Sequence, residues 1–537
     1  MVKCLEEEGV TRIFGYPGVA ISPFYEALYN AGTIEHVLVR QGQAAGHAAS
    51  GYARISRKAA VCVTSSGPGA TNLITALATA YADSIPLIAI TGQVNSNLLG
   101  RDVFQEADMR GSTESFVKYS YLVKSADDIP RIFKEAFYIA STGRKGPVLI
   151  DIPCDVQIDL LKKSFDYTSE VNIRGYKPST KGNNPQMHKV VAAINKAKKP
   201  LICAGGGVWL ADAREELLEL AEGSEIPVVK TMMGLSLLPT DHPLNMGMIG
   251  AHGNHCANQA LAKADLLIMV GTRAADRAVV DPREIQRRMA TIHIDVDPAE
   301  IGKNMQAAIP LVGNVKVILR QILDRGAPVT NSAAWLEQLT DFRRAELNRR
   351  FPHREGYVFP GTVLRKLGAR LDDDAVVCVD VGQNQIFTCK YLPQKNGRLL
   401  TSGGLGTMGY ALPAAVGAKV ARPDRQTIVV CGDGSFQMAM NELAAVRAGG
   451  LNLKIVLFRN HTLGLVHQIQ SSAPYHGPFG VALDGSPDFE TIAQAYGIPS
   501  LTVRDEDRLD GVLDQFLAAP GCGLLICEVH PDVGTND

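Results

Sequence analysis

The chain has almost no excess charge, because 54 Lys and Arg residues oppose 55 Asp and Glu residues and the formal net charge is −1. It has no basic run with interleaved aromatic residues, and aromatic residues make up only 6%. These absences remove the electrostatic basis for binding nucleic acid or an anionic membrane. No apolar run reaches the length of a membrane span. The segment Met1–Glu8 is acidic and helical in character rather than a secretory signal, so the cytoplasm is the expected location.

Paired cysteines are also lacking. The ten cysteines are scattered, and several stand inside apolar segments, as Cys62 and Cys431 do. This pattern indicates small buried apolar residues in a reducing compartment rather than a disulfide framework. His252, His255 and Cys256 lie close together, but no second ligand pair accompanies them. A glycine-rich loop is therefore favoured over a zinc site.

The chain does contain a regular alternation of apolar strands and helical segments, which is typical of parallel α/β sheets. It divides into three units, 1–165, 187–325 and 361–537, of which the first and third are similar in size and kind. A polar linker with Gly and Pro residues, 166–186, and a charged helical connector, 334–350, separate them. The expected fold is α/β, with three doubly wound parallel-sheet domains. The predicted strands of the first two units are Ala60–Thr64, Leu87–Thr91, Val148–Ile152, Leu201–Ala204, Leu266–Val270 and Thr291–Asp295.

The third unit carries the most informative motif. Gly432, Asp433, Gly434 and Ser435 follow a predicted strand, Ile428–Cys431, and Asn460 follows another, Lys454–Phe458. A helix from Phe436 to Ala448 is predicted between them, ended by two glycines. Two strand ends of a parallel sheet therefore each present an oxygen ligand at the edge where ligands bind. Glycines that allow close approach, together with a carboxylate, suit a magnesium ion that holds a diphosphate.

Motifs in all three units resemble the acetolactate synthase (acetohydroxyacid synthase) catalytic-subunit family of thiamine-diphosphate enzymes, which includes glyoxylate carboligase. The resemblance implies a pyrimidine-binding domain, a central domain and a diphosphate-binding domain. It also implies an active site between two chains, hence a homodimer or homotetramer, and leaves open a regulatory subunit. The matching segments are Phe14–Gly18, Thr64–Asn72, Ala82–Pro86, Thr91–Gln93, Phe104–Glu106, Gly146–Pro153, Asp380–Gln383 and Ser402–Gly409.

The same resemblance implies three cofactors: thiamine diphosphate, Mg²⁺ and FAD. Asp433, Asn460 and the Thr462 carbonyl match the magnesium ligands, and Met408 matches the apolar residue that bends thiamine diphosphate. The positions matched to thiamine diphosphate are Pro17, Gly18, Val381, Gly382, Gln383, Asn384, Gly406, Met408, Gly432, Asp433, Gly434 and Ser435. The positions matched to FAD are Gly205, Gly206, Gly207, Gly250, His252, Arg273 and Asp295.

One catalytic position departs from the family pattern. Family members carry a glutamate that hydrogen-bonds the pyrimidine ring of the cofactor, and Gly42 stands in its place. Three interpretations remain open. In the first, the enzyme works without the glutamate, with a neutral hydrogen bond from Gln41 or Gln43. In the second, it binds the cofactor but is catalytically crippled. In the third, another residue or a bound water has taken over. The first is favoured because the rest of the cofactor apparatus is intact.

The acceptor pocket also departs from the family pattern. Phe104 and Gln105 match residues near the reacting keto acid, and Arg273 matches an arginine that grips the acceptor carboxylate. Its alternative partners are a flavin phosphate or a surface carboxylate. Four positions carry replacements, which indicates an altered acceptor: Ala251, Ala274, Leu465 and Ile469.

The sequence therefore predicts decarboxylation of a small 2-keto acid and carboligation to a second carbonyl. Pyruvate, giving 2-acetolactate in branched-chain amino acid biosynthesis, is the leading donor, and glyoxylate is the nearest rival. A cofactor-binding protein without catalysis is the alternative from another class. A nicotinamide dehydrogenase built on the central unit is disfavoured, because no Gly-x-Gly-x-x-Gly with a correctly placed acidic residue is present.

Overall fold

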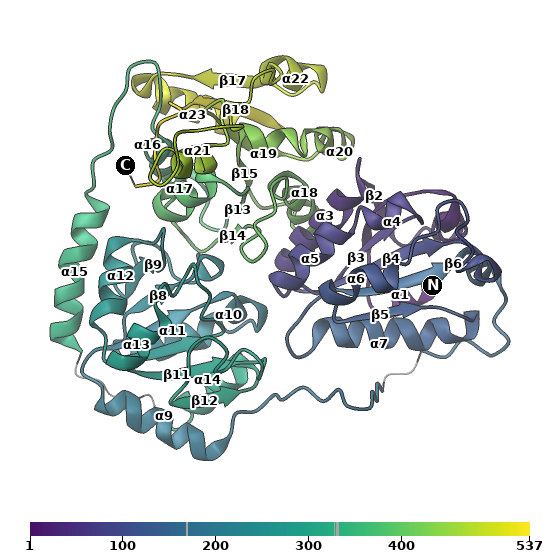
Figure 1. Ribbon diagram of the computed structural model, residues 1–537, viewed down its shortest axis with the longest axis horizontal. Coiled ribbons are helices and arrows are strands. Elements are labelled where there is room, and N and C mark those ends of the chain that lie inside the picture. The colour runs from purple at the N-terminus through teal and green to yellow at the C-terminus, as the bar shows by residue number, and fades with distance from the viewer. Residues whose placement is uncertain (168–169, 327, 329–331, 537) are drawn as a thin grey trace.

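The computed structural model describes residues 1–167, 170–326, 328 and 332–536. Three separate sheets, each of six parallel strands, are arranged around a common centre (Figure 1). Helices cover the faces of each sheet, so the predicted α/β fold class is confirmed. No helix in these described ranges is long and apolar enough to cross a membrane.

The first sheet has the strand order β2-β1-β3-β4-β6-β5. Its strands are β1 (Arg12–Tyr16), β2 (Glu35–Leu38), β3 (Ala60–Thr64), β4 (Leu87–Gln93), β5 (Tyr119–Leu122) and β6 (Val148–Pro153). The longer helices around it are α2 (Ser22–Ala31), α3 (Gly42–Ser56), α5 (Ile74–Ala82) and α7 (Ile129–Ser141). The three strands predicted for this unit are confirmed.

The third sheet repeats that topology, because its order β14-β13-β15-β16-β18-β17 follows the same path through the sheet. Its strands are β13 (Val376–Val379), β14 (Arg398–Leu400), β15 (Thr427–Gly432), β16 (Leu453–Arg459), β17 (Ser500–Val503) and β18 (Gly523–Glu528). Its helices include α16 (Pro360–Arg370), α17 (Gln383–Tyr391), α18 (Ala411–Ala421), α21 (Gly464–Gln470), α22 (Phe489–Ala495) and α23 (Leu509–Ala518). The similarity expected of the first and third units is therefore a shared topology.

The central sheet is wound differently, in the order β12-β11-β10-β7-β8-β9, which is the 3-2-1-4-5-6 order of dinucleotide-binding folds. Its strands are β7 (Pro200–Ala204), β8 (Val228–Lys230), β9 (Asn245–Met248), β10 (Leu266–Val270), β11 (Ala290–Asp295) and β12 (Ile309–Val312). Its helices include α9 (Asn184–Lys196), α10 (Gly206–Leu210), α11 (Arg214–Gly223), α12 (His255–Lys263), α13 (Pro282–Arg288) and α14 (Val315–Leu323). The connector helix α15 (Ala333–Leu347) packs on α12 and leads to the third domain.

Two-sided burial explains why the central strands are continuously apolar. In β15, Ile428 and Val430 belong to one core cluster, while Val429 and Cys431 belong to another on the opposite face. Side chains alternate between the faces of a strand, and helices cover both faces of a parallel sheet, so each residue must be apolar. The single apolar run at this point thus predicted a central strand correctly.

The helix predicted from Phe436 to Ala448 is wrong as a continuous element. The chain instead forms α19 (Asp433–Gln437), a 3-10 turn, η6 (Met440–Glu442), and α20 (Leu443–Ala448). The break falls at Ala439, whose φ of −136° is not helical. There the chain contacts the neighbouring Gly409, where an added Cβ would lie 3.1 Å from the Met438 Cβ. Packing against that loop overrides the helical periodicity.

The first and third domains join through α3 and α18, which cross with their main chains in contact. An added Cβ on Gly51 would lie 1.9 Å from the Ala414 carbonyl oxygen, and one on Gly417 would lie 1.8 Å from the Ala48 carbonyl oxygen. Only glycine permits this approach. The first and central domains are tied elsewhere, where Arg144 pairs with Asp297 and Glu300. Residues 170–183 of the predicted linker run along the outside between these two domains as far as the start of α9 (Figure 1).

Candidate active site

At the carboxyl edge of the first sheet, small residues let three turns meet. Pro17 and Gly18 follow β1, and an added Cβ on Gly18 would lie 2.5 Å from the Ser65 Cβ at the end of β3. An added Cβ on Gly67 would likewise lie 2.8 Å from the Gln105 Cβ. β1 and β3 are adjacent, but the chain continues from β1 to β2 on one side of this pair and from β3 to β4 on the other. This edge is therefore a topological switch point, where ligands bind in such sheets.

Gly42 lies at the same edge, buried at the first position of α3. An added Cβ would stand 3.0 Å from the Gly69 carbonyl oxygen and 3.1 Å from the Asn72 Cβ, so the neighbouring turn fills the space. Beside it, the buried hydroxyls of Thr64 and Ser65 have no hydrogen-bond partner among the described residues. The position where the family pattern has a glutamate is therefore fitted to glycine in this chain.

Gln43 follows Gly42, and its amide nitrogen lies 3.2 Å from Nε2 of His47. Burial, with a smaller contribution from the Arg54 charge, lowers the pKa of His47 to about 3. The imidazole is therefore neutral at physiological pH. Gln43, predicted as a neutral hydrogen-bond donor, already has this partner within the chain.

Phe104 and Gln105 lie on a surface loop that Glu106 organises. The Glu106 carboxylate accepts hydrogen bonds from the main-chain N–H groups of Gly100 and Val103, and these bonds lower the Glu106 pKa. The Phe104 ring is 87% exposed, and Gln105 has a left-handed φ of 59°. Gln105 packs on Gly67 of the first domain, where an added Cβ would lie 2.8 Å from the Gln105 Cβ.

At the carboxyl edge of the third sheet, the end of β15 meets the end of β16, as predicted. The Asp433 carboxylate accepts hydrogen bonds from the main-chain N–H groups of Gly434 (3.0 Å), Asn460 (3.1 Å) and His461 (2.7 Å). Burial raises the pKa of Asp433, and the three N–H groups oppose that rise. The carboxylate is thus held rigidly beside the Asn460 side chain, with oxygen ligands of the kind that magnesium prefers.

The turn after β13 completes this edge. Gly382, with a φ of 132°, leads into α17, and Asn384 donates a hydrogen bond to the Asp380 carbonyl at 2.6 Å. Gln383 accepts a long hydrogen bond from the Asn460 amide, at 3.4 Å. An added Cβ on Gly432 would lie 3.2 Å from the Asn384 Oδ1. The structure therefore brings the predicted diphosphate turn, Val381–Asn384, against the predicted metal ligands.

Met408 reaches the same place from a glycine-rich loop. An added Cβ on Gly434 would lie 3.6 Å from the Met408 Cε. The buried Asp380 holds the far end of the loop by accepting hydrogen bonds from the main-chain N–H groups of Gly409 (2.9 Å) and Ala411 (3.0 Å). Burial raises the pKa of Asp380 to about 6, although these N–H groups favour the carboxylate. Sequence reasoning placed Asp380 in a motif but gave it no function; its position at the end of a buried strand was the available signal.

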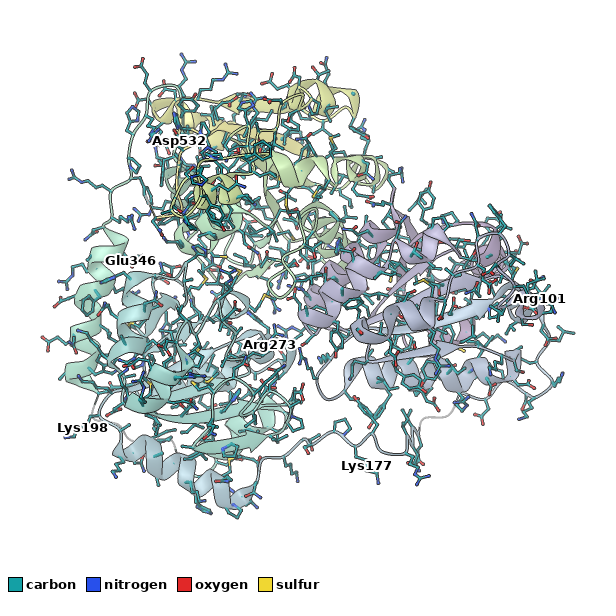
Figure 2. All side chains as sticks on the ribbon, in the orientation of Figure 1. Arg101, Lys177, Lys198, Arg273, Glu346 and Asp532 are labelled. Atoms are coloured by element: carbon teal, nitrogen blue, oxygen red, sulfur yellow. The ribbon has the colours of Figure 1, made fainter. Side chains whose placement is uncertain are left out.

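A cavity of about 760 Å³ opens between the three domains. The central domain contributes Gly206, Gly207, His252, Arg273 and Asp295 to its wall, and the third domain contributes Val381, Gly406, Leu465 and Ile469. Figure 2 shows Arg273 at the centre of the molecule, on the side of the central domain that faces the other two. Arg273 and two of the four replaced pocket positions, Leu465 and Ile469, thus share one cavity. Ala274 is buried in the central core instead, and Ala251 is exposed.

The central part of this cavity lies at the switch point between β7 and β10. An added Cβ on Gly205 would lie 2.4 Å from the Gly271 carbonyl oxygen, and one on Gly250 would lie 2.1 Å from the Arg277 carbonyl oxygen, so both glycines support the wall from behind. In the described part of the chain, the buried Nδ1 of His252 has no partner. Burial raises the pKa of Asp295 to about 6. Glycine turns, an unpartnered imidazole nitrogen and a carboxyl group at a switch point suit a dinucleotide.

Family models match all three domains. They are the thiamine pyrophosphate enzyme N-terminal TPP-binding domain over residues 1–112, the central domain over 187–322 and the C-terminal TPP-binding domain over 380–527. The chain therefore belongs to the thiamine pyrophosphate enzymes.

Similar proteins narrow the class. The chain is 42% identical to the probable acetolactate synthase large subunit of Methanocaldococcus jannaschii, over 99% of this chain and 91% of that protein. It is 41% identical to the acetolactate synthase large subunit of Lactococcus lactis, over 93% of this chain and 86% of that protein. It is 40% identical to the acetolactate synthase large subunit of Haemophilus influenzae, over 96% of this chain and 91% of that protein. Within the thiamine pyrophosphate enzymes, the chain is a member of the acetolactate synthase large-subunit family.

Proposed function

We propose that the chain is the catalytic large subunit of an acetolactate synthase, which decarboxylates pyruvate and joins the remainder to a second 2-keto acid. The observation that carries the proposal is the meeting of Asp433, Asn460 and Met408 at one edge of the third sheet, in a chain that aligns with such subunits over nearly its whole length. The proposed domain limits are 1–165, 187–325 and 361–537.

Thiamine diphosphate, when bound, supplies a nucleophilic carbon and a ring that accepts the electron pair left as a 2-keto acid loses carbon dioxide. The residues of this chain fit it. Gly382, Gly432 and Gly434 leave room for close approach of the diphosphate to the main chain. The Asp433 carboxylate, the Asn460 side-chain oxygen and the Thr462 carbonyl are the proposed Mg²⁺ ligands.

The large cavity supplies the remaining parts of the site. Arg273 is positioned to bind the carboxylate of the acceptor, and its guanidinium suits a bidentate contact. Leu465 and Ile469 form an apolar wall beside it, which orients the substrate and excludes water. The glycine-lined central part, with His252 and Asp295, is the proposed FAD site. FAD has a structural function there, because carboligation involves no net redox step.

A second copy of the chain would complete the site. In the described residues, the two half-sites (Gly18, Gly42 and Gln105 in the first domain; Gln383, Asp433 and Asn460 in the third) share no hydrogen bond. Apolar side chains are exposed beside both half-sites: Tyr16, Val19, Phe104, Leu405, Met438 and Val466. A homodimer or homotetramer that pairs the two edges would bury these residues.

Because the relatives are named large subunits, a regulatory subunit is a further proposed partner. The ten free cysteines support a reducing, cytoplasmic location.

We infer that the enzyme works without the glutamate that Gly42 replaces. The turn at Gly69 and Asn72 packs closely against Gly42, so a side chain at this position would require that turn to shift. The rest of the site retains its carboxylate, amide and glycine positions, so the site is built as a whole around glycine.

Product analysis tests the proposal. The purified protein with thiamine diphosphate, Mg²⁺ and FAD is incubated with ¹³C-labelled pyruvate, and products are identified by NMR. Labelled 2-acetolactate and carbon dioxide are expected. Tartronate semialdehyde from glyoxylate, with pyruvate unchanged, would support the glyoxylate carboligase alternative instead. Cofactor binding without conversion of any 2-keto acid would reject catalysis.

A further inference from the structure

A buried ion pair of the first domain holds the glycine-rich loop of the third domain that carries Met408, here called the Met408 loop and defined as residues 401–410. Asp83, directly after α5, accepts hydrogen bonds from the main-chain N–H groups of Gly404 (2.7 Å) and Gly403 (3.4 Å). The same carboxylate pairs with Arg54 of α3 at 2.6 Å. The Asp83 side chain is 0% exposed and the Arg54 side chain is 3% exposed, so solvent does not screen the pair.

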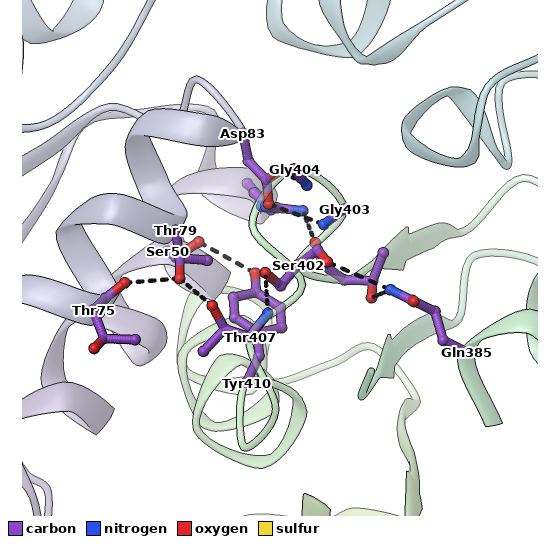
Figure 3. Close-up of polar contacts among 12 residues, drawn as sticks. Ser50, Thr75, Thr79, Asp83, Gln385, Ser402, Gly403, Gly404, Thr407 and Tyr410 are labelled. Carbon is purple, nitrogen blue, oxygen red and sulfur yellow. Dashed lines mark hydrogen bonds and ion pairs between the residues drawn. The ribbon is translucent and has the colours of Figure 1, made fainter. Parts of the chain in front are cut away.

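Two further contacts extend this attachment along the loop. The second guanidinium branch of Arg54 donates a hydrogen bond to the Thr401 carbonyl at 2.9 Å. The Thr79 hydroxyl of α5 lies 2.7 Å from the Thr407 hydroxyl (Figure 3). The first domain thus contacts the loop near its start, at its centre and next to Met408 itself.

The loop needs such attachment because four of its residues are glycine: Gly403, Gly404, Gly406 and Gly409. Glycine loses the most backbone entropy on folding, so a segment rich in it is ordered only where other groups fix it. Asp380 fixes the end at Gly409 from within the third domain. Gly406, in contrast, has no atom within 4 Å of an added Cβ. On the other side of Met408, the third domain holds the start of the loop through Gln385 of α17, which donates a hydrogen bond to the Thr401 hydroxyl at 2.6 Å, and the Thr407 N–H bonds to the Ser402 hydroxyl at 3.0 Å. The first-domain contacts add the fixation at Gly403 and Gly404, between these points.

We propose that Arg54 and Asp83 are positioning residues, which set Met408 against Gly434 at the diphosphate edge by fixing the Met408 loop from the first domain. The proposal rests on the proposed function for its catalytic consequence. α3 begins at Gly42 and carries Arg54 in its last turn. If the half-sites of two copies combine as proposed, this one helix joins the Gly42 end of one active site to the Met408 loop of the other.

Hydrogen exchange of the cofactor-free protein, followed by mass spectrometry, tests the fixation without relying on catalysis. In Asp83→Asn, exchange in peptides covering 402–407 is expected to rise about tenfold or more, the change that loss of a charge-assisted hydrogen bond predicts. Peptides of β15 and β16 are expected to keep the wild-type rates. Arg57→Gln is the matched control, because Arg57 follows α3 and forms an exposed pair with Asp212. It should leave the loop unchanged.

If Asp83→Asn does not fold, Thr79→Val provides the second variant, since it removes the contact with Thr407 and leaves the Arg54–Asp83 pair intact. It also removes the hydrogen bond from the Thr79 hydroxyl to the Thr75 carbonyl within α5, so peptides of α5 are compared as well. Unchanged exchange of the loop, or an equal rise throughout the third domain, would overturn the positioning assignment.

Catalysis gives an independent readout. In Asp83→Asn, thiamine diphosphate affinity and kcat should both fall about tenfold, while KM for the 2-keto acid stays within about twofold. Arg54→Lys keeps a charge for Asp83 but loses the Thr401 contact, so it should give intermediate values. A raised KM with unchanged kcat would contradict positioning. If the wild-type protein converts no 2-keto acid while loop exchange still responds, the proposed function fails and the fixation stands.

Discussion

Glu442 of the third domain accepts a hydrogen bond at 2.9 Å from the main-chain N–H of Arg40, two residues before Gly42. Its other carboxyl oxygen is buried and has no partner among the described residues. A single acidic side chain of η6 therefore holds the turn from which α3 starts, although 402 residues of sequence separate the two. Sequence reasoning missed this contact, because nothing local to Glu442 indicates it.

The environment of Glu442 predicts a pH-dependent stability. Burial raises its pKa to about 7, with partial opposition from the hydrogen bond of Arg40. A carboxyl group whose pKa is raised on folding stabilises the protein at low pH, and this contribution is lost as pH rises through about 7. Glu442→Gln keeps the acceptor and stays neutral. Between about pH 5 and pH 8, the free energy of unfolding of Glu442→Gln should therefore fall less than that of the wild type, by up to about 3 kcal/mol. The measurement is the apparent melting temperature of both proteins across this pH range. Parallel melting curves would contradict the prediction.

Substitution of Gly42 is expected to destabilise the first domain. In Gly42→Ala the new Cβ meets the Gly69 carbonyl oxygen at 3.0 Å and the Asn72 Cβ at 3.1 Å, so we expect a loss of about 1–3 kcal/mol. Gly511→Ala is the control, because this glycine lies within α23 and its added Cβ would meet no atom within 4 Å. It should stabilise by about 0.5–1 kcal/mol. Urea unfolding of both variants measures the contrast, and equal effects would reject the tight packing at Gly42.

Gly42→Glu tests the function of the same position. If the resemblance places it correctly, the new carboxylate should speed exchange of the reactive carbon-bound proton of thiamine diphosphate in deuterated buffer, measured by NMR after acid quench. Gly42→Gln is the neutral control and should accelerate less, because an amide shifts the ring tautomer less than a carboxylate does. A rate equal to the wild-type rate in a folded Gly42→Glu variant, which still binds the cofactor, would end this assignment.

Asp433→Asn should weaken thiamine diphosphate binding in the presence of Mg²⁺ by about a hundredfold. The amide lacks the anionic oxygen that the metal prefers, and it turns a donor group toward main-chain N–H groups at 460 and 461. Asp424→Asn, at an exposed site paired with Arg422, is the matched control. Titration calorimetry with and without Mg²⁺ gives the affinities. An unchanged affinity in Asp433→Asn would remove this residue from the metal site.

Arg273 has two candidate partners, the acceptor carboxylate and a flavin phosphate, and Arg273→Gln separates them. If the residue binds the acceptor, KM for the 2-keto acid should rise about tenfold and FAD affinity should stay unchanged. If it binds the flavin, fluorescence titration should show FAD affinity falling instead. Arg283→Gln, beyond the cavity wall in α13, is the control. A variant that changes neither quantity would exclude both functions for Arg273.

Burial was the property that the sequence conveyed best. The strand at Ile428–Cys431 was predictable because every one of its side chains is buried, and the meeting of Asp433 with Asn460 followed from parallel pairing of β15 with β16. The contacts that depend on tertiary packing were not predictable. The break at Ala439, the closure of Asn72 over Gly42 and the attachment of Asp83 to the Met408 loop all arise between segments far apart in sequence. Local periodicity carries no information about them.

The main-chain contact of Gly51 with Ala414 bears on how this chain behaves when it is cut. A protease that cleaves the covalent connection between residues 170 and 182 leaves the crossing of α3 and α18 untouched. The two fragments should separate on a denaturing gel and yet elute together from a sizing column. The first domain is thus held to the third by packing, and to the central domain by the covalent connection and the ion pairs of Arg144. Separate expression of the fragments should reconstitute the whole only while the small residues at this crossing are kept.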